Sequence, residues 1–329
     1  MSAGSIGSVP ARPGRGAATQ PASPARRRLL AGRHDTADEL PRHLLGVSRT
    51  TSAVLTAVCV LFALFTLAPL AWIVINSTKT QANIFQTFGF WFARPFELWH
   101  NISLLDQNVV GNGTYLQWLA NTALYAGVGS VGATLFATLA GYGFSRYRFR
   151  GKGALFAIVM SALLVPVSAI TLPLYLVYAK AHLINSIWGM ILPSIVSPVG
   201  VFLMRTFIDA ALPRELIDAA RVDGSGEVRI FLRIGVPLIV PGLVTVLLLS
   251  VVAIWNNYFL PLFIFSQNQL YPVTVGLSQL SSHGTTSGSL AVEPLLVLGG
   301  LVTILPLALL FVVLQRYWRG GALLGGIAG

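Results

Sequence analysis

Charged residues are scarce in this 329-residue chain, in which Asp, Glu, Lys and Arg together make up only 10%. A soluble domain carries about 25% charged residues. Hydrophobic residues reach 54% instead, and the mean hydropathy is +0.72. A soluble protein with apolar helices buried in a large core would need a polar outer layer, which this composition does not supply. The composition therefore indicates a membrane protein.

Groups that perform catalysis are also scarce. Cys59 is the single cysteine, which excludes a disulfide or a multi-thiolate metal site within the chain. The five histidines form no pair at metal-ligand spacing and no HExxH motif. The stretch RGKG at 150–153 lacks the first glycine and the hydroxyl residue of a phosphate-binding loop, so it predicts a tight turn. The sequence predicts no enzymatic activity, no metal site and no cofactor in this chain.

Hydrophobic residues gather in six blocks long enough to cross a bilayer, for which about 20 residues are needed. The blocks are Ala53–Ile75, Leu119–Gly143, Leu155–Ala179, Ile187–Met204, Val236–Phe265 and Pro294–Gln315. They predict an all-α protein with six transmembrane helices. The predicted domains are a disordered basic N-terminal tail over 1–49, a transmembrane domain over 50–319 and a short C-terminal tail over 320–329.

Positive charge is distributed unevenly between the two sides of these blocks. Of the 22 Lys and Arg residues, all but Lys79, Arg94 and Lys180 lie before the first block or after the second, fourth or sixth. Because positive charge marks the cytoplasmic face, both termini are expected in the cytoplasm. The net charge of +11 then reflects topology and attraction to anionic lipid headgroups rather than nucleic-acid binding.

One segment between the fourth and fifth blocks is highly charged. It contains eight charged residues: Arg214, Glu215, Asp218, Arg221, Asp223, Glu227, Arg229 and Arg233. A charge at the bilayer centre costs about 2.5–3.5 kcal/mol, so this segment is expected at the cytoplasmic membrane face. Pro213 suits the first helical position and Gly224 a left-handed stop, which predicts a short helix over 213–224. By these residues alone, an ordinary solvated loop is an equal alternative.

The segment also contains a motif. PRELIDAARVDG, followed after nine residues by Ile234-Gly-Val-Pro237, resembles the EAA signature of the membrane subunits of binding-protein-dependent ABC importers. Asp218 stands where the family has Glu, and Val236 where it has Leu. The stretches NTALYAGVGSVGATLFATLAGYGFSRYRFRGKG, PLYLVYAKAHLINSIWGMILP and WNNYFLPLFIF extend the resemblance over roughly residues 50–319. They are most similar to the carbohydrate-uptake subgroup, which includes the six-span second membrane subunit of the maltose transporter.

The resemblance implies the permease fold of type I ABC importers and a role in sugar or oligosaccharide import. It implies that the loop over 205–235 holds a coupling helix docked in a cleft of a cytoplasmic ATPase subunit. The residues that it assigns to docking are Glu215, Asp218, Ala219, Ala220, Arg221, Asp223, Gly224, Ile234 and Pro237. The implied partners are a homologous second permease, two ATPase subunits that hold ATP and Mg, and an extracellular solute-binding protein, all at the bacterial plasma membrane.

Two alternatives concern the solute and the energy source. Another solute, such as glycerol phosphate or a polyamine, is compatible with the same architecture. A secondary transporter would need ionisable residues inside its spans for coupling ions, and the predicted spans contain none at mid-depth, since Glu293 lies at an edge.

Polar and aromatic residues within the spans are candidates for the solute path, because amides and aromatic faces suit sugar hydroxyls and ring faces. They are Asn121, Tyr125, Trp255, Asn256, Asn257 and Tyr258. Trp and Tyr also anchor helices at the membrane interface, which is the alternative for WNNYF. In the maltose transporter, the resemblance assigns most sugar contacts to the other membrane subunit.

Overall fold

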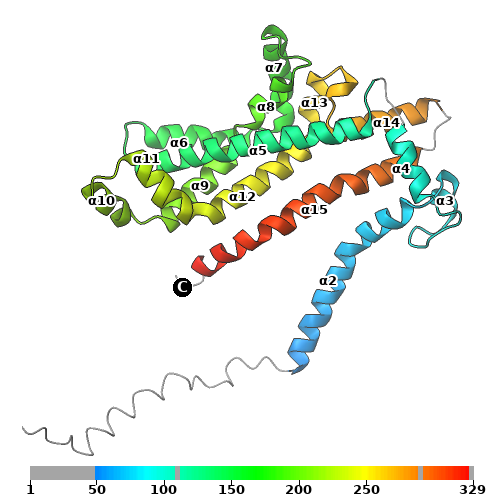
Figure 1. Cartoon of the computed structure of the whole chain (residues 1–329), viewed down its shortest axis with the longest axis horizontal. Coiled ribbons are helices and arrows are strands. Elements are labelled where there is room, and N and C mark those ends of the chain that lie inside the picture. Colours follow the sequence, from blue (N-terminus) through cyan, green and yellow to red (C-terminus); the bar gives the residue numbers. More distant parts are fainter. Residues whose placement is uncertain (1–48, 108–111, 288–291, 326–329) are drawn as a thin grey trace, which may run out of the picture. The chain divides into compact units, whose positions relative to one another are not determined.

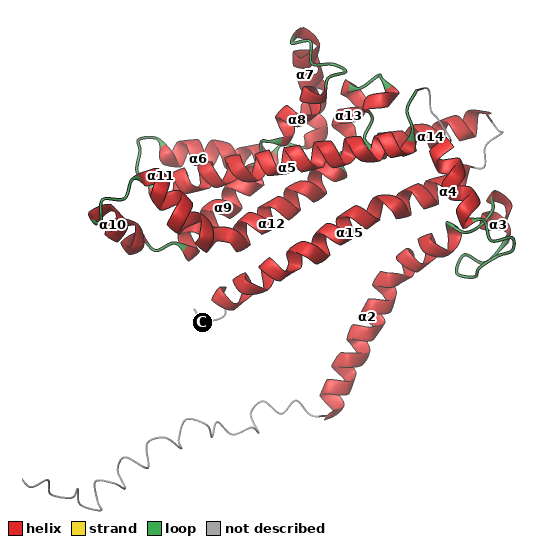
Figure 2. Cartoon of the chain, in the orientation of Figure 1, coloured by secondary structure: helices red, strands yellow, loops and turns green. Residues whose placement is uncertain are grey.

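The computed structural model describes residues 49–107, 112–287 and 292–325, and the chain divides into two compact units, Met1–Phe65 and Thr66–Gly329. The regular elements of these residues are helices (Figures 1 and 2). In chain order they are α2 (Arg49–Asn76), α3 (Gln81–Gln86), α4 (Leu98–Gln107), α5 (Tyr115–Arg146), α6 (Lys152–Ser161), η2 (Ala162–Leu164), α7 (Val167–Lys180), α8 (Ile187–Ser194), α9 (Pro198–Ala211), α10 (Arg214–Val222), α11 (Glu227–Ile230), η3 (Phe231–Gly235), α12 (Val236–Trp255), α13 (Phe259–Ile264), η4 (Asn268–Leu270), α14 (Val273–Ser287) and α15 (Val292–Gly325).

The prediction of an all-α protein with about six spans is confirmed. Five helices are long and apolar enough to cross a membrane, and a sixth span results if one bent pair of helices is counted as one. The five are Thr50–Asn76, Tyr115–Arg146, Ile187–Ala211, Glu227–Trp255 and Val292–Tyr317. The predicted tail over 1–49 lies outside the described residues except for Arg49, which begins α2. Helix α15 continues through the first part of the predicted C-terminal tail, to Gly325.

The third predicted span is not one straight helix. Lys152–Leu164 and Ser168–Lys180 meet at an angle of 105°. The break is at Val165, which is extended with φ −86° and ψ 119°, and at Pro166. Proline has no N–H to donate, and it disfavours the helical conformation of the residue before it. The hydrophobicity of this block was continuous, so composition alone did not reveal the bend.

The fourth and fifth spans extend further into the charged segment than predicted. The fourth reaches Ala211 rather than Met204, and the fifth begins at Glu227 rather than Val236. The loop predicted over 205–235 is thus mostly helical, because an amphipathic helix can continue beyond the bilayer until a cap ends it. At its other end the fifth span stops earlier than predicted, since residues 256–258 interrupt the helix before α13.

Helices α5, α9 and α12 pack together and support the charged segment at one end (Figure 1). Small residues allow this packing: a Cβ on Gly141 would lie 2.8 Å from the backbone N of Arg205 on α9. Such close approach is typical of helix pairs in membranes. The core at this end is formed by Ala137, Tyr142, Met204, Ile208, Leu212, Ile217, Ala220, Ile230, Ile239 and Val246.

Candidate functional site: the α10 segment

Helix α10 has sharply defined ends. Pro213 caps its N-terminus in an extended conformation, with φ −61° and ψ 145°, one residue before the position predicted for it. At its C-terminus, Gly224 adopts φ +79°, as the sequence predicted. The Gly224 N–H donates to the Arg221 carbonyl and the Ser225 N–H to the Ala220 carbonyl, both at 3.0 Å. This pair of bonds forms a Schellman motif, which satisfies the last carbonyls of the helix.

One face of α10 is buried in the core. Ile217 and Ala220, three residues apart on the helix, are 2% and 8% exposed. They belong to the same cluster as Ile208 and Leu212 of the preceding segment and Ile230 of α11. Burial of this face fixes the rotation of α10 about its axis, and therefore determines which side chains it presents outward.

A second face of α10, beside the buried one, is exposed and partly apolar. Leu216 is 42% exposed and Val222 is 88% exposed, and Ala219 lies between them on the surface. Val228 on the next helix, α11, is also apolar and is 72% exposed. Exposed apolar residues that are grouped on one surface mark an interaction site more often than residues scattered singly.

A network of charged residues fixes the turn between α10 and α11. Arg221 donates from Nε to Glu227 Oε1 at 2.7 Å and from Nη2 to Glu227 Oε2 at 3.2 Å, a bidentate pair. Its Nη1 donates to Asp218 Oδ1 at 3.0 Å, and the Tyr147 hydroxyl donates to Glu227 Oε2 at 2.9 Å. The hydrogen bonds to Glu227 are the main reason that the pKa of Arg221 is raised above its usual value. Because these groups are exposed, the network adds little to the stability of the fold, and its main effect is to define the conformation of the turn.

The remaining motif residues lie at a local widening of the helix. Phe231–Gly235 forms a π-helix, in which the Val236 N–H bonds to the Phe231 carbonyl. Ile234 is partly buried against the core, whereas Pro237 is exposed at the start of α12. A proline near this point lacks the N–H that a regular α-helix would use, and π-bulges occur frequently at functional sites. Glu215 and Asp223 are both exposed on α10 and its C-cap.

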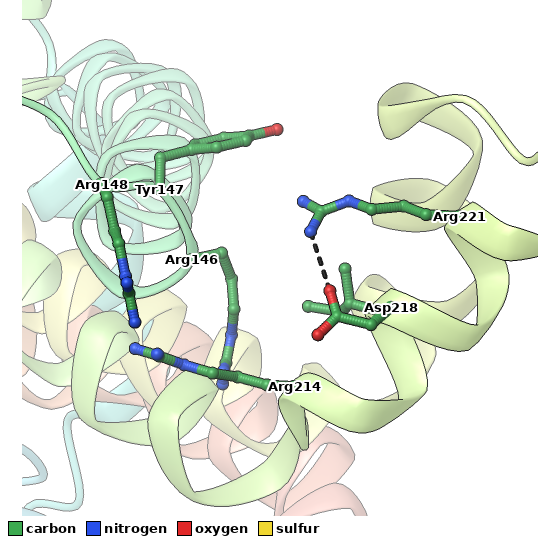
Figure 3. A pocket seen from close by; sticks show the side chains of 7 residues that line it. Arg146, Tyr147, Arg148, Arg214, Asp218 and Arg221 are labelled. Carbon is green, nitrogen blue, oxygen red and sulfur yellow. Dashed lines mark hydrogen bonds and ion pairs between the residues drawn. The ribbon is translucent and has the colours of Figure 1, made fainter.

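A pocket of about 360 Å³ lies between α10 and the chain that follows α5 (Figure 3). It is lined by Arg146, Tyr147, Arg148, Arg214, Ile217, Asp218 and Arg221. Sequence reasoning did not assign Tyr147, Arg148 or Glu227 to the site. The charge distribution contained a usable signal, because it predicted the basic run after the second span on the same membrane face as the charged segment.

The six residues predicted for the solute path divide into two groups. Asn121 Nδ2 donates to the carbonyls of Gln269 and Tyr271 at 2.7 and 3.1 Å. The hydroxyl of the buried Tyr125 donates to the Leu270 carbonyl at 2.9 Å. These two side chains therefore hold the backbone of the 269–271 segment.

The second group contains the residues at the end of α12. Trp255 is 5% exposed, and its indole Nε1 is buried without a hydrogen-bond partner among the described residues. Asn256, Asn257 and Tyr258 form the interruption between α12 and α13. The Asn257 carbonyl accepts a hydrogen bond from Thr274 at 2.9 Å, and the Tyr258 hydroxyl lies 3.1 Å from that of Ser278. The residues at the break between α12 and α13 therefore contact α14 through both backbone and side-chain groups.

Comparisons with known proteins agree with this architecture. Residues 133–319 match the family described as "Binding-protein-dependent transport system inner membrane component". The chain is 34% identical over 220 residues to the arabinooligosaccharides transport system permease protein AraQ of Bacillus subtilis, covering 67% of this chain and 76% of that protein. It is 30% identical over 267 residues to the lactose transport system permease protein LacG of Rhizobium radiobacter, covering 80% and 92%.

A solved structure shows the same fold. It is a crystal structure of a bacterial ABC transporter involved in the import of the acidic polysaccharide alginate, with a TM-score of 0.69 and 22% identity, covering 82% of this chain and 98% of that one. The family match covers more than half of the chain and includes α10 with its flanking spans. This chain therefore belongs to the inner membrane components of binding-protein-dependent transport systems, and it is a multi-pass, non-catalytic permease subunit of an ABC transporter.

Proposed function

We propose that this chain forms half of the translocation path of an ATP-driven importer for a sugar or oligosaccharide. Two of the relatives described above are permeases for arabinooligosaccharides and lactose, which supports a carbohydrate as the solute. As a binding-protein-dependent component, the chain works with an ATPase and a solute-binding protein. We propose the finer composition of one homologous permease, two ATPase subunits holding ATP and Mg, and one extracellular binding protein.

The observation that carries the coupling role is the two-sided construction of α10. Its inner face is fixed by Ile217 and Ala220 in the core, while Leu216 and Val222 are exposed on the outside. A short helix with a fixed axis and an exposed apolar face is suited to transmit a displacement between two subunits. We propose that this outer face docks on the ATPase. We also propose that Asp218, whose side chain is 67% exposed and which lies one helical turn before Val222, meets a basic group of the ATPase at the edge of that face.

The topology and the path complete the proposal. Both termini and α10 are placed in the cytoplasm, as the uneven distribution of Lys and Arg predicts. For the solute path, the break at Asn256–Tyr258 is the better-supported part, because irregular backbone at membrane depth is tolerated where it is buried in protein or lines a cavity. Asn121 and Tyr125 would act beside it by holding the 269–271 segment.

Uptake measurements test the transport role. A strain that lacks this gene should lose uptake of a radiolabelled oligosaccharide, and a plasmid copy should restore it. Loss of glycerol phosphate or polyamine uptake, with sugar uptake intact, would contradict the carbohydrate assignment.

Substitutions test the docking surface separately. Leu216→Lys and Val222→Lys should reduce co-purification of the ATPase subunit while the chain stays in the membrane at normal levels. The matched control is Phe85→Lys on α3, which places the same charge at an apolar residue that is 69% exposed, on the predicted outer side. If all three variants retain the ATPase equally, the ATPase does not dock on the outer face of α10.

A further inference from the structure

We propose that the pocket beneath α10 binds the phosphate group of an anionic phospholipid at the cytoplasmic membrane face. The pocket lies between α10 and the end of α5, and measures about 360 Å³. Four of its lining residues are arginines and one is an aspartate. The proposal rests on the membrane location and orientation of the chain, and not on the identity of the transported solute.

The positive charge in this pocket is only partly neutralised by the protein, because Arg221 is paired with Asp218 and Glu227. Asp218 already accepts a hydrogen bond from Arg221. Arg148 and Arg214 have no hydrogen bond or ion pair with any of the described residues. Figure 3 shows their guanidinium groups turned toward each other on one side of the pocket. Two neighbouring cations without an acidic partner repel one another, and an anion between these two would replace the repulsion by attraction.

Arg146 adds a second, independent observation. It is one of the lining residues, and its Nη2 donates to the Ile208 carbonyl of α9, which fixes the side chain. Its Nε is buried and has no hydrogen-bond partner among the described residues. A buried donor without a partner is costly. The guanidinium geometry favours oxyanions such as phosphate, which accept two parallel N–H bonds.

The surroundings favour a lipid as the source of that phosphate. Phe149, which follows Arg148 directly in the chain, and Leu155 on α6 are 44% and 49% exposed. Exposed apolar residues at the end of a span are typical of a surface that faces acyl chains. Basic pockets between helices on the cytoplasmic side are a known arrangement for anionic headgroups.

Helical spacing separates this pocket from the proposed ATPase-docking face. Arg214, Ile217, Asp218 and Arg221 line the pocket and follow one another at intervals of three, one and three residues, which puts them on one stripe of α10. Leu216 and Ala219 lie on the opposite side of a helix with 3.6 residues per turn. An acidic group of the ATPase that docks on the outer face would therefore not reach this pocket from that face.

The test is native mass spectrometry of the purified full-length chain, in detergent, incubated with equal amounts of phosphatidylglycerol and phosphatidylcholine. The wild-type chain should retain phosphatidylglycerol preferentially. Arg148→Gln combined with Arg214→Gln should lower this preference by about 30-fold, since a cation near an anionic lipid contributes roughly a five-fold effect. Arg229→Gln combined with Arg233→Gln removes the same charge outside the pocket and should keep the preference. Arg148→Lys with Arg214→Lys retains the charge and should keep most of it.

The outcomes separate the possible occupants. If both glutamine pairs lower the preference for phosphatidylglycerol equally, the preference depends on the overall charge of the chain rather than on the pocket, and the proposal is overturned. If millimolar inorganic phosphate raises the melting temperature of the wild-type chain but not of the pocket variant, and neither lipid is preferred, the oxyanion site stands and its lipid source is overturned. If the pocket variant binds phosphatidylglycerol normally but no longer retains the ATPase, the cluster belongs to protein docking. Because the assay needs no solute and no ATPase, its failure is independent of a failure in sugar uptake.

Discussion

Replacement of Gly224 tests whether the conformation at the end of α10 is required for coupling. Gly224 has φ +79°, and a Cβ added there would meet no atom within 4 Å. The substitution is therefore free of steric clash with neighbours, and its cost is the left-handed backbone itself, about 1–2 kcal/mol for an ordinary L-residue. Valine should cost more than alanine, because β-branched residues are rare at positive φ.

This strain has a predictable route of relief. The last turn of α10 would unwind and break the bond from the Ser225 N–H to the Ala220 carbonyl. Val222 and Arg221 lie on that turn, and Arg221 bonds to Glu227 of α11, so the proposed docking face would lose its fixed shape. If docking requires the intact turn, 1–2 kcal/mol corresponds to roughly a 5- to 30-fold loss of affinity for the ATPase subunit. The spans should still insert, because nothing within the bilayer changes.

The chain contains a matched control at Gly151. It has φ +80°, also with no atom within 4 Å of an added Cβ, and it lies in the turn before α6. Gly151→Ala should introduce the same backbone cost without altering α10. Asparagine tolerates the left-handed region, so Gly224→Asn should retain most of the function.

The assay is the affinity of the ATPase subunit for the chain in nanodiscs, measured by biolayer interferometry beside solute uptake in cells. Gly224→Ala should weaken binding and uptake, Gly224→Val should weaken them further, and Gly151→Ala should leave both unchanged. The reasoning is refuted if Gly224→Val binds the ATPase and transports normally at normal expression. It is also refuted if Gly151→Ala causes an equal loss, because the effect would then be one of general stability.

Three further predictions concern topology, catalysis and the path. In a Cys59→Ala background, Ser103→Cys should react with an impermeant thiol reagent added outside the cell and Ser225→Cys should not; the reverse pattern contradicts cytoplasmic termini. The purified chain should hydrolyse no ATP until an ATPase subunit is added. Hydrolysis by the chain alone, free of contaminants, would contradict its proposed role. Tyr125→Phe leaves the Leu270 carbonyl without its donor, so it should lower stability by about 1–3 kcal/mol in thermal unfolding, with an unchanged KM for uptake. A changed KM at normal stability would instead place Tyr125 in contact with the solute.

The ends of α10 could be predicted from the sequence because they depend on local rules. Proline before a helix and glycine after it act through their own backbone preferences, and both were found within one residue of the predicted positions. The prediction of topology from the charge distribution is of the same kind, since the cost of a charge in the bilayer does not depend on tertiary contacts. Such features need no knowledge of neighbouring helices.

Other features depend on contacts between distant parts of the chain. Tyr147 and Glu227 are 80 positions apart and meet only because the C-terminus of α5 lies beside the N-terminus of α11. Asn121 and Tyr125 were candidates for the solute path by residue type, but their partners are backbone carbonyls about 150 positions away. Hydrophobicity shows that a polar group lies within a span, but it does not show which carbonyl that group reaches. The size of the bend at Val165 and Pro166, 105°, was likewise not predictable, because a proline inside an apolar block is compatible with either a kink or a break.

The same construction accounts for both proposed properties of α10. A segment with eight charges has to leave the bilayer, and a nine-residue helix cannot remain folded alone in water. It is stable because Ile217 and Ala220 anchor one face in the core. Anchoring that face turns Leu216 outward toward a partner and turns Arg214 inward toward the end of α5. A displacement of the outer face by the ATPase would therefore be transmitted directly to α9 and α12, and an anion held by Arg148 and Arg214 would join α10 to the end of α5. Docking and anion binding are then energetically linked, so phosphatidylglycerol should tighten ATPase binding in the wild-type chain and lose that effect in the Arg148→Gln, Arg214→Gln variant.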